Sequence, residues 1–251
     1  MDRDLFQRYA RATREAFAAG LGCDVSAFDG EQLTVVDRPT DAQWYTASAV
    51  TFATGTVLAI DPDYRDFVDA NRPRAHRRAL APAFLQSLVA EGARRGHVLE
   101  YDAPSLCFTL CDHPAVIPVP RGFELREHDA AWMNAEQPHR RFENAVGQPG
   151  VGGRGFRNRF ALVLVDSRGE HVAVAGAFVL YGMLEIGVDV APEHRGLGLG
   201  RLMVSTIARE IVQRGALPFY ACATTNIRSH RTAEASGFSI ICCDAAVTAV
   251  R

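Results

Sequence analysis

The spacing of hydrophobic positions along the chain predicts which segments fold as helices and which as strands. Apolar side chains recur every three to four residues over 2–19, 81–95 and 199–214, and this spacing predicts three helices. Short apolar runs rich in β-branched residues predict strands at 33–36, 47–60, 98–101, 106–110, 123–126, 160–166, 171–180, 184–190 and 218–222. Helices and strands are therefore mixed along the whole chain, which predicts the α/β class, with a mixed sheet flanked by helices.

Prolines mark one place where this pattern is interrupted. Residues 112–120 contain three prolines, and the strand pattern restarts at Phe123. We therefore expect a linker here, between a smaller N-terminal α/β domain at 1–117, whose role the sequence does not identify, and a second domain at 121–251. In the second domain we expect residues 240–250 to supply the last two strands of the sheet.

Composition and charge narrow the class of protein. The chain has 251 residues, 48% of them hydrophobic, which suffices for a packed core, and its formal net charge of −2 argues against a general nucleic-acid binder. The N-terminal segment is charged throughout and no apolar run is long enough to span a bilayer, so we expect a cytoplasmic protein. The six cysteines fit no zinc-binding spacing, and no metal site is predicted.

The stretch 184–214 has the spacing of an anion-binding site. A strand-like run is followed by a turn with Gly196, Gly198 and Gly200 and then by an amphipathic helix. The first N–H groups of a helix have no partner within it, and glycines carry no Cβ that would hold a phosphate away. Two common phosphate motifs are excluded, because Arg201 stands where a dinucleotide fingerprint needs a third glycine and because the chain contains no lysine for a P-loop.

The pattern that remains, Arg195-x-x-Gly198-x-Gly200, resembles the R/Q-x-x-G-x-G/A pyrophosphate loop of the GCN5-related N-acetyltransferase (GNAT) superfamily. The flanking segments extend the resemblance over 121–251: a first strand at 121–126, the Val-x-Pro ending of a fourth strand at 190–192, a fifth strand at 218–222, and Asn226 at the usual distance before Gly237-Phe238. This resemblance implies a GNAT acyl-CoA N-acyltransferase fold. By analogy with tandem members, it suggests that the N-terminal part is a degenerate half of the same kind.

The resemblance also implies acetyl-CoA as cosubstrate and assigns a place to each part of it. In the family the fourth and fifth strands separate, the pantetheine arm lies between them, and the glycine turn binds the pyrophosphate. The positions that match as cofactor-binding are Val188, Asp189, Val190, Arg195, Gly196, Leu197, Gly198, Leu199, Gly200, Arg201, Asn226 and Ser229. Asn226 has a second reading, as a helix cap only. Residues 147–159, with five glycines and three arginines, are either a loop on the acceptor side, as the family favours, or a surface excursion.

Transfer to an amine requires that a base or a water chain remove a proton. The resemblance implies Glu185 as this base, since several relatives carry a carboxylate there, and an ordinary strand residue facing solvent is the alternative. The tyrosine that often protonates the leaving thiolate, seven residues after the Asn, is replaced by Ala233. Tyr181 and Tyr220 are the spare candidates for its role, and Cys222 is expected either to line the thioester pocket or to be buried without function.

We therefore expect an enzyme, an acetyl-CoA-dependent N-acetyltransferase that acts on the primary amine of a small acceptor. Two alternatives stay open: a non-catalytic acyl-CoA-binding or sensor protein, and an acyltransferase that uses another acyl-CoA. The expected partner is a small-molecule amine, with no nucleic acid and no membrane, and the oligomeric state is open between monomer and homodimer. The sequence does not identify the acceptor.

Overall fold

The computed structural model describes residues 1–42, 44–135, 141–146 and 157–250, and the expected loop at 147–159 therefore lies largely outside the described residues. The strands are β1 (Leu33–Asp37), β2 (Ala47–Thr51), β3 (Thr56–Ile60), β4 (Leu99–Tyr101), β5 (Ser105–Leu110), β6 (Phe123–Asp129), β7 (Arg157–Asp166), β8 (His171–Leu180), β9 (Met183–Val190), β10 (Pro218–Ala223) and β11 (Phe238–Ala249). The α-helices are α1 (Arg3–Leu21), α2 (Arg65–Ala70), α3 (Pro82–Arg94), α4 (Ala130–Met133), α6 (Glu143–Val146), α7 (Leu199–Gln213) and α8 (Ile227–Ala235). Short 3-10 helices are η1 (Val25–Phe28), η2 (Pro62–Tyr64), η3 (His76–Leu80) and η4 (Pro192–His194).

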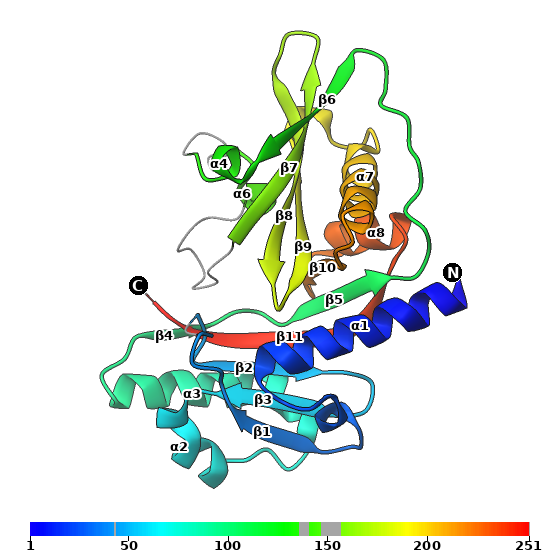
Figure 1. Ribbon diagram of the computed structural model, residues 1–251. Coiled ribbons are helices and arrows are strands. Elements are labelled where there is room, and N and C mark those ends of the chain that lie inside the picture. Colours follow the sequence, from blue (N-terminus) through cyan, green and yellow to red (C-terminus); the bar gives the residue numbers. More distant parts are fainter. Residues whose placement is uncertain (43, 136–140, 147–156, 251) are drawn as a thin grey trace.

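One mixed sheet runs through the whole molecule (Figure 1). Its strand order is β1-β3-β2-β11-β5-β10-β9-β8-β7-β6, and β4 pairs with β11 beside this path. The α/β class and the mixed sheet predicted from the sequence are thus confirmed. Among the described residues, none of the helices combines the length and the apolar character needed to cross a membrane.

Helices cover both faces of the strands in the N-terminal half, residues 1–110. In β3, Val57 and Ala59 pack in the same cluster as Phe17 of α1, while Leu58 and Ile60 pack in a second cluster with α2 and α3. A strand buried on both faces has an apolar side chain at nearly every position. This explains why hydrophobic and polar residues alternate only weakly in this part of the sequence.

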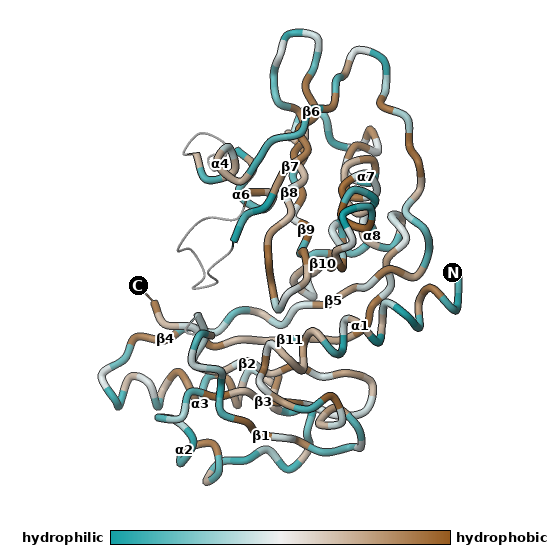
Figure 2. Tube along the Cα trace, viewed as in Figure 1, coloured by the Kyte–Doolittle hydropathy of each residue, from teal (hydrophilic) through white to brown (hydrophobic). Residues whose placement is uncertain are grey.

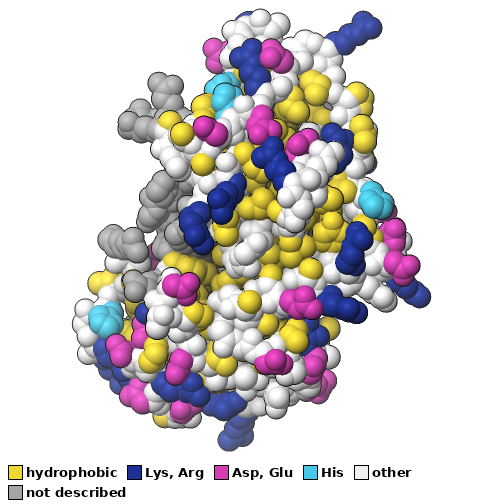
Figure 3. Space-filling model, viewed as in Figure 1, with side chains coloured by type: hydrophobic (Ala, Val, Ile, Leu, Met, Phe, Trp, Pro, Cys, Tyr) yellow, Lys and Arg dark blue, Asp and Glu magenta, His cyan; other side chains and the backbone are white. Residues whose placement is uncertain are grey.

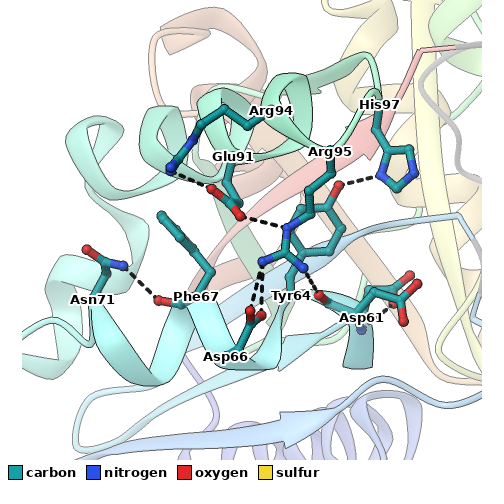
Figure 4. Close-up of polar contacts among 10 residues, drawn as sticks. Asp61, Tyr64, Asp66, Phe67, Asn71, Glu91, Arg94, Arg95 and His97 are labelled. Carbon is teal, nitrogen blue, oxygen red and sulfur yellow. Dashed lines mark hydrogen bonds and ion pairs between the residues drawn. The ribbon is translucent and has the colours of Figure 1, made fainter.

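A polar network joins α2 to α3 beside the second cluster (Figure 4). Arg95 donates to the Glu91 carboxylate at 2.7 Å and to both carboxylate oxygens of Asp66, at 3.0 and 3.1 Å. The same guanidinium lies 5.0 Å from the centre of the Tyr64 ring, and the Tyr64 hydroxyl lies 2.6 Å from Nδ1 of His97. These contacts fix the relative positions of the two helices.

The C-terminal half, residues 123–250, is organised around the antiparallel strands β6 to β9. Strands β7 and β8 are hydrophobic along most of their length, whereas β6 at the edge is largely hydrophilic (Figure 2). Ile207 and Ile211 of α7 pack in the cluster on one face of the sheet, and Met133 of α4 and Ala145 of α6 pack in the cluster on the other. This half therefore has the two-sided cover that the helical and strand spacing predicted.

The two halves meet within the sheet, and here one expectation is wrong. Residues 238–249 form the single strand β11, with a register shift between Ile240 and Cys242, instead of ending in two strands. The place beside β10 is taken by β5, which pairs with β10 on one edge and with β11 on the other. Because β5 comes from the N-terminal half, neither half has a complete sheet without the other.

Aromatic side chains close the junction between the halves. Tyr181, in the turn between β8 and β9, has a positive φ of 49°, rare for a residue other than glycine. Its ring lies 5.2 Å from that of Phe17 in α1 and 6.0 Å from that of Trp44. The residues between β5 and β6 form no helix or strand. The division into independent domains at 1–117 and 121–251 stays a prediction.

Candidate active site

A cleft opens where β9 and β10 part. The two strands are paired in parallel only at Leu184 with Pro218 and at Glu185 with Phe219. Beyond these pairs β9 continues alongside β8, and the gap on its other side is part of a cleft of about 1410 Å³. Strands β9 and β10, the glycine turn, α7 and α8 form its walls.

The glycine turn and the first residues of α7 form one end of the cleft. Gly196 and Gly198 have positive φ angles of 83° and 77°, and a Cβ at either position would meet no atom within 4 Å. Within the protein, glycine is therefore required here for its backbone conformation, and the expectation that a Cβ would hold a phosphate away stays a prediction. Nε of Arg195 donates to the carbonyl of Val190 at 3.1 Å and ties the turn to the end of β9.

Most cofactor-binding positions expected from the sequence lie on the walls of this cleft. The residues that do so are Val188, Asp189, Val190, Arg195, Gly196, Gly198, Leu199, Gly200, Arg201, Asn226 and Ser229. Leu197 does not line it, and its side chain is 62% exposed. Sequence reasoning missed Arg228 and Arg231, which line the cleft from α8. One arginine every turn on a polar helix surface is too common to predict a site.

Asp189 lines the cleft and also has a structural role. Its carboxylate accepts hydrogen bonds from the backbone N–H groups of Asn144 and Ala145, at 2.8 and 3.1 Å, and from the Asn144 side-chain amide at 2.8 Å. It thus caps the start of α6. Burial raises the pKa of Asp189, although the three hydrogen bonds act in the opposite direction.

Two facing glycines allow α6 to lie directly on the sheet. Gly176 of β8 and Gly187 of β9 are paired in register. A Cβ on Gly176 would come within 1.7 Å of the Ala145 carbonyl oxygen, and one on Gly187 within 1.9 Å of the Asn144 carbonyl oxygen. Any larger residue at either position would push the helix away from the cleft.

Glu185 lies at the end of the cleft opposite the glycine turn. Its side chain is only 6% exposed, so the alternative of an ordinary residue facing solvent is wrong. Its Cα pairs with Phe178 on β8 and with Phe219 on β10. Burial raises the pKa of Tyr220, and the negative charge of Glu185 acts in the same direction.

The wall formed by β10 and α8 holds several polar groups. Asn226 caps α8, since its side-chain oxygen accepts from the N–H of Ser229 at 3.1 Å, and it also lines the cleft. The hydroxyls of Ser229 and Tyr220 are 2.7 Å apart. Cys222 lines the cleft as well, and burial raises the pKa of its thiol, so it is a poor nucleophile at neutral pH.

The remaining candidates occupy other places. Ala233 is fully buried, and Tyr181 belongs to the junction between the halves, away from the cleft wall. His194 borders the cleft beside the glycine turn. Ser105, the first residue of β5, also borders it and brings the N-terminal half to the site. In the described part of the chain, no group of His, Cys, Asp and Glu side chains is arranged to hold a metal ion.

Comparison with known proteins agrees with this geometry. The model of the acetyltransferase (GNAT) family matches residues 123–238. No curated protein matches the chain by sequence. Among solved structures, a Drosophila protein shares 18% identity over 82% of this chain and 75% of its own, with a TM-score of 0.52, which shows a common fold.

Two further solved structures are similar at lower TM-scores. A GCN5-related N-acetyltransferase from Kribbella flavida shares 17% identity over 96% of this chain and 95% of its own, with a TM-score of 0.49. A putative acetyltransferase from Salmonella typhimurium, solved with acetyl-CoA, shares 16% identity over 52% of this chain and 95% of its own, with a TM-score of 0.36. The family match, on the residues that carry the strands and the glycine turn, decides the assignment: the C-terminal half of this chain belongs to the GNAT acetyltransferase family.

Proposed function

We propose that this protein is an acetyl-CoA-dependent N-acetyltransferase that acts on the primary amine of a small acceptor. One observation carries the proposal: the cleft beside β9 has a glycine turn and a helix N-terminus at one end and the buried Glu185 at the other. Val190 comes five positions after Glu185 on an extended strand, which corresponds to about 16 Å. An extended acyl carrier can therefore place its phosphates at one end and its thioester at the other.

The residues present fit coenzyme A in their chemistry. The helix N-terminus and Arg195, Arg201, Arg228 and Arg231 offer N–H donors and positive charge to phosphate groups. Beyond Glu185, the edge of β9 turns toward the cleft and offers backbone groups to the amides of a pantetheine arm, as a sheet edge does to an added strand. When bound, acetyl-CoA supplies the activated acetyl thioester.

Glu185 is the residue that we propose as the base. A primary amine is mostly protonated at neutral pH and attacks only after it loses a proton. A carboxylate on the strand beside the thioester can accept that proton directly or through one water molecule. The acceptor side of the cleft is bordered by Glu143 and Asn144 of α6 and by Phe178, a combination that admits a small polar molecule.

A screen for thiol release tests the proposal. Acetyl-CoA is offered with diamines, polyamines, amino acids and aminoglycosides, and free coenzyme A is measured. Release that depends on one class of amine supports the proposal. Tight binding of coenzyme A with no release for any amine would instead favour an acyl-CoA-binding or sensor protein. Release only with a longer acyl-CoA would favour another acyl donor. A cytoplasmic location stays a prediction.

A further inference from the structure

Two hydroxyl groups from different elements meet at the point where the strands separate. Tyr220 follows Phe219, the last residue of β10 that pairs with β9. Its hydroxyl oxygen lies 2.7 Å from that of Ser229 on α8, and both residues line the cleft. This pair therefore stands beside the place where the proposed function puts the thioester.

The surface of α8 that faces β10 is built from small residues. Ser229 and Ala233 are four positions apart and lie on the same face of the helix. Ala233 is fully buried in the same cluster as Tyr220 and Phe238. The tyrosine hydroxyl at this wall comes from strand β10 and not from position 233 of α8.

Either of the two hydroxyl groups can be the donor in this contact. Burial raises the pKa of Tyr220 to about 12, so its hydroxyl keeps its proton at neutral pH. A Tyr220 hydroxyl that donates to Ser229 leaves the Ser229 proton for another acceptor. The thiol of Cys222 lines the same wall of the cleft. A neutral thiol is a weak acceptor, and a thiolate would take the hydrogen bond in its place.

We propose that Ser229 donates a hydrogen bond to the sulfur of the leaving coenzyme A thiolate, and that Tyr220 is the positioning residue that holds Ser229 in the donor orientation. In this step the amine nitrogen bonds to the acetyl carbon, the carbon–sulfur bond breaks, and its electron pair moves to the sulfur. The proton that the amine loses supplies the proton of the coenzyme A thiol, so the products are the amide and the free thiol. The inference rests on the proposed function, because it concerns the same cleft and the same cosubstrate.

The test measures the acidity of the thiol of bound coenzyme A, which requires no acceptor. Thiolate absorbance is titrated for the complex with coenzyme A and referenced to the complex with desulfo-coenzyme A, which lacks the thiol. In the wild type we expect the bound thiol to be more acidic than free coenzyme A. Ser229→Ala should lower its acid dissociation constant about tenfold, since it removes a hydrogen bond to a charged group.

Tyr220→Phe should produce a smaller change in the same direction. The double variant should not exceed Ser229→Ala, because Tyr220 acts through Ser229. Tyr64→Phe is the matched control: Tyr64 and Tyr220 are both 2% exposed, and Tyr64 lies in the N-terminal network. It should leave the acidity of the bound thiol unchanged. Ser229→Ala keeps the backbone N–H that Asn226 caps, so it is expected to fold even if Tyr220→Phe does not.

Two results would overturn the inference in distinguishable ways. If Ser229→Ala binds coenzyme A and leaves the acidity of its thiol at the wild-type value, Ser229 does not contact the sulfur, while the proposed function stands. If the folded wild-type protein does not bind coenzyme A at all, the proposed function fails together with the inference.

Discussion

Glu91 and Glu185 are buried to nearly the same extent, 8% and 6% exposed, but they lie in different surroundings. Glu91, in the N-terminal half, forms ion pairs with Arg94 and Arg95. Glu185, in the C-terminal half, lines a cleft between two separating strands. The first carboxylate is paired with Arg95, which also binds Asp66 of α2, whereas the second faces space that a ligand can enter.

The two buried tyrosines repeat this contrast. Tyr64 contacts His97 and Arg95 within a network that α2 and α3 enclose (Figure 4). Tyr220 contacts a serine on the wall of the cleft. Burial of a polar side chain therefore does not by itself indicate function. What separates the two halves is whether the buried group borders a hollow or only its structural partners.

Hydrophobic side chains gather across the middle of the face shown in Figure 3, and charged side chains are scattered over both its upper and its lower part. Substitutions in the network should accordingly change stability, and those in the cleft should change binding or turnover.

The largest expected effect comes from Glu185→Gln. Loss of a general base typically lowers turnover by about 10²-fold or more, and the affinity for coenzyme A should stay near the wild-type value. Steady-state kinetics with the acceptor found in the screen, and calorimetry with coenzyme A, measure the two quantities. Glu91→Gln is the control and should lose stability, by about 1–3 kcal/mol, with normal turnover. Normal turnover of Glu185→Gln would move the base role to water.

Gly187→Ala tests whether α6 must lie directly on the sheet. The new Cβ would come within 1.9 Å of a backbone oxygen of α6, so the helix has to move or the protein loses about 1–3 kcal/mol of stability. We expect turnover with the acceptor to fall while coenzyme A still binds at the other end of the cleft. Thermal unfolding and kinetics check both parts, and an unchanged melting temperature with full turnover would contradict the observed contact.

Gly198→Val tests the glycine turn. A β-branched residue at a φ of 77° is strained, so the turn should change shape and the affinity for coenzyme A should fall by more than tenfold, at least about 1.4 kcal/mol. Gly96→Val provides the matched control, because Gly96 has a φ of 81° and equally open surroundings far from the cleft. Calorimetry with coenzyme A on the two folded variants distinguishes backbone strain from loss of the binding site. Equal affinities of the two variants would show that the turn is not part of the site.

The smallest effect is expected from Tyr64→Phe. The substitution removes one hydrogen bond to His97 in the N-terminal network, which is worth about 1 kcal/mol. Denaturant unfolding should show this loss, while turnover and coenzyme A affinity stay at wild-type values. A clear loss of turnover would mean that the network is coupled to the cleft, and the contrast between the halves would be weaker than we infer.

The structure of the C-terminal half could be predicted in large part from local patterns. The spacing of apolar residues gave the strands β7 to β9 and the helix α7, because each depends mainly on which of its own faces is buried. The glycine turn was equally visible, since Gly196 and Gly198 supply a backbone conformation that few other residues adopt. The resemblance of this turn and its flanking strands to the GNAT family then predicted the position of the cleft.

Other features depend on which segments meet in space. Tyr220 and Ser229 lie on different elements, and only the packing of α8 against β10 brings their hydroxyls together. The capping of α6 by Asp189 likewise joins residues far apart in the chain. No local pattern encodes such contacts, because each partner has an ordinary place in its own helix or strand.

By itself, the sequence determined the class of fold, the family of the C-terminal half and the residues of the glycine turn, because these follow from short-range spacing and backbone conformation. The tertiary structure alone decided that β5 of the N-terminal half lies between β10 and β11, and that residues 238–249 form one strand although two had been expected from residues 240–250. The alternation of hydrophobic and polar residues specifies which face of a strand is buried. It does not specify which other strand pairs with it, because that depends on which strand edges are available in the folded chain. The same long-range pairing brings Ser105 to the cleft.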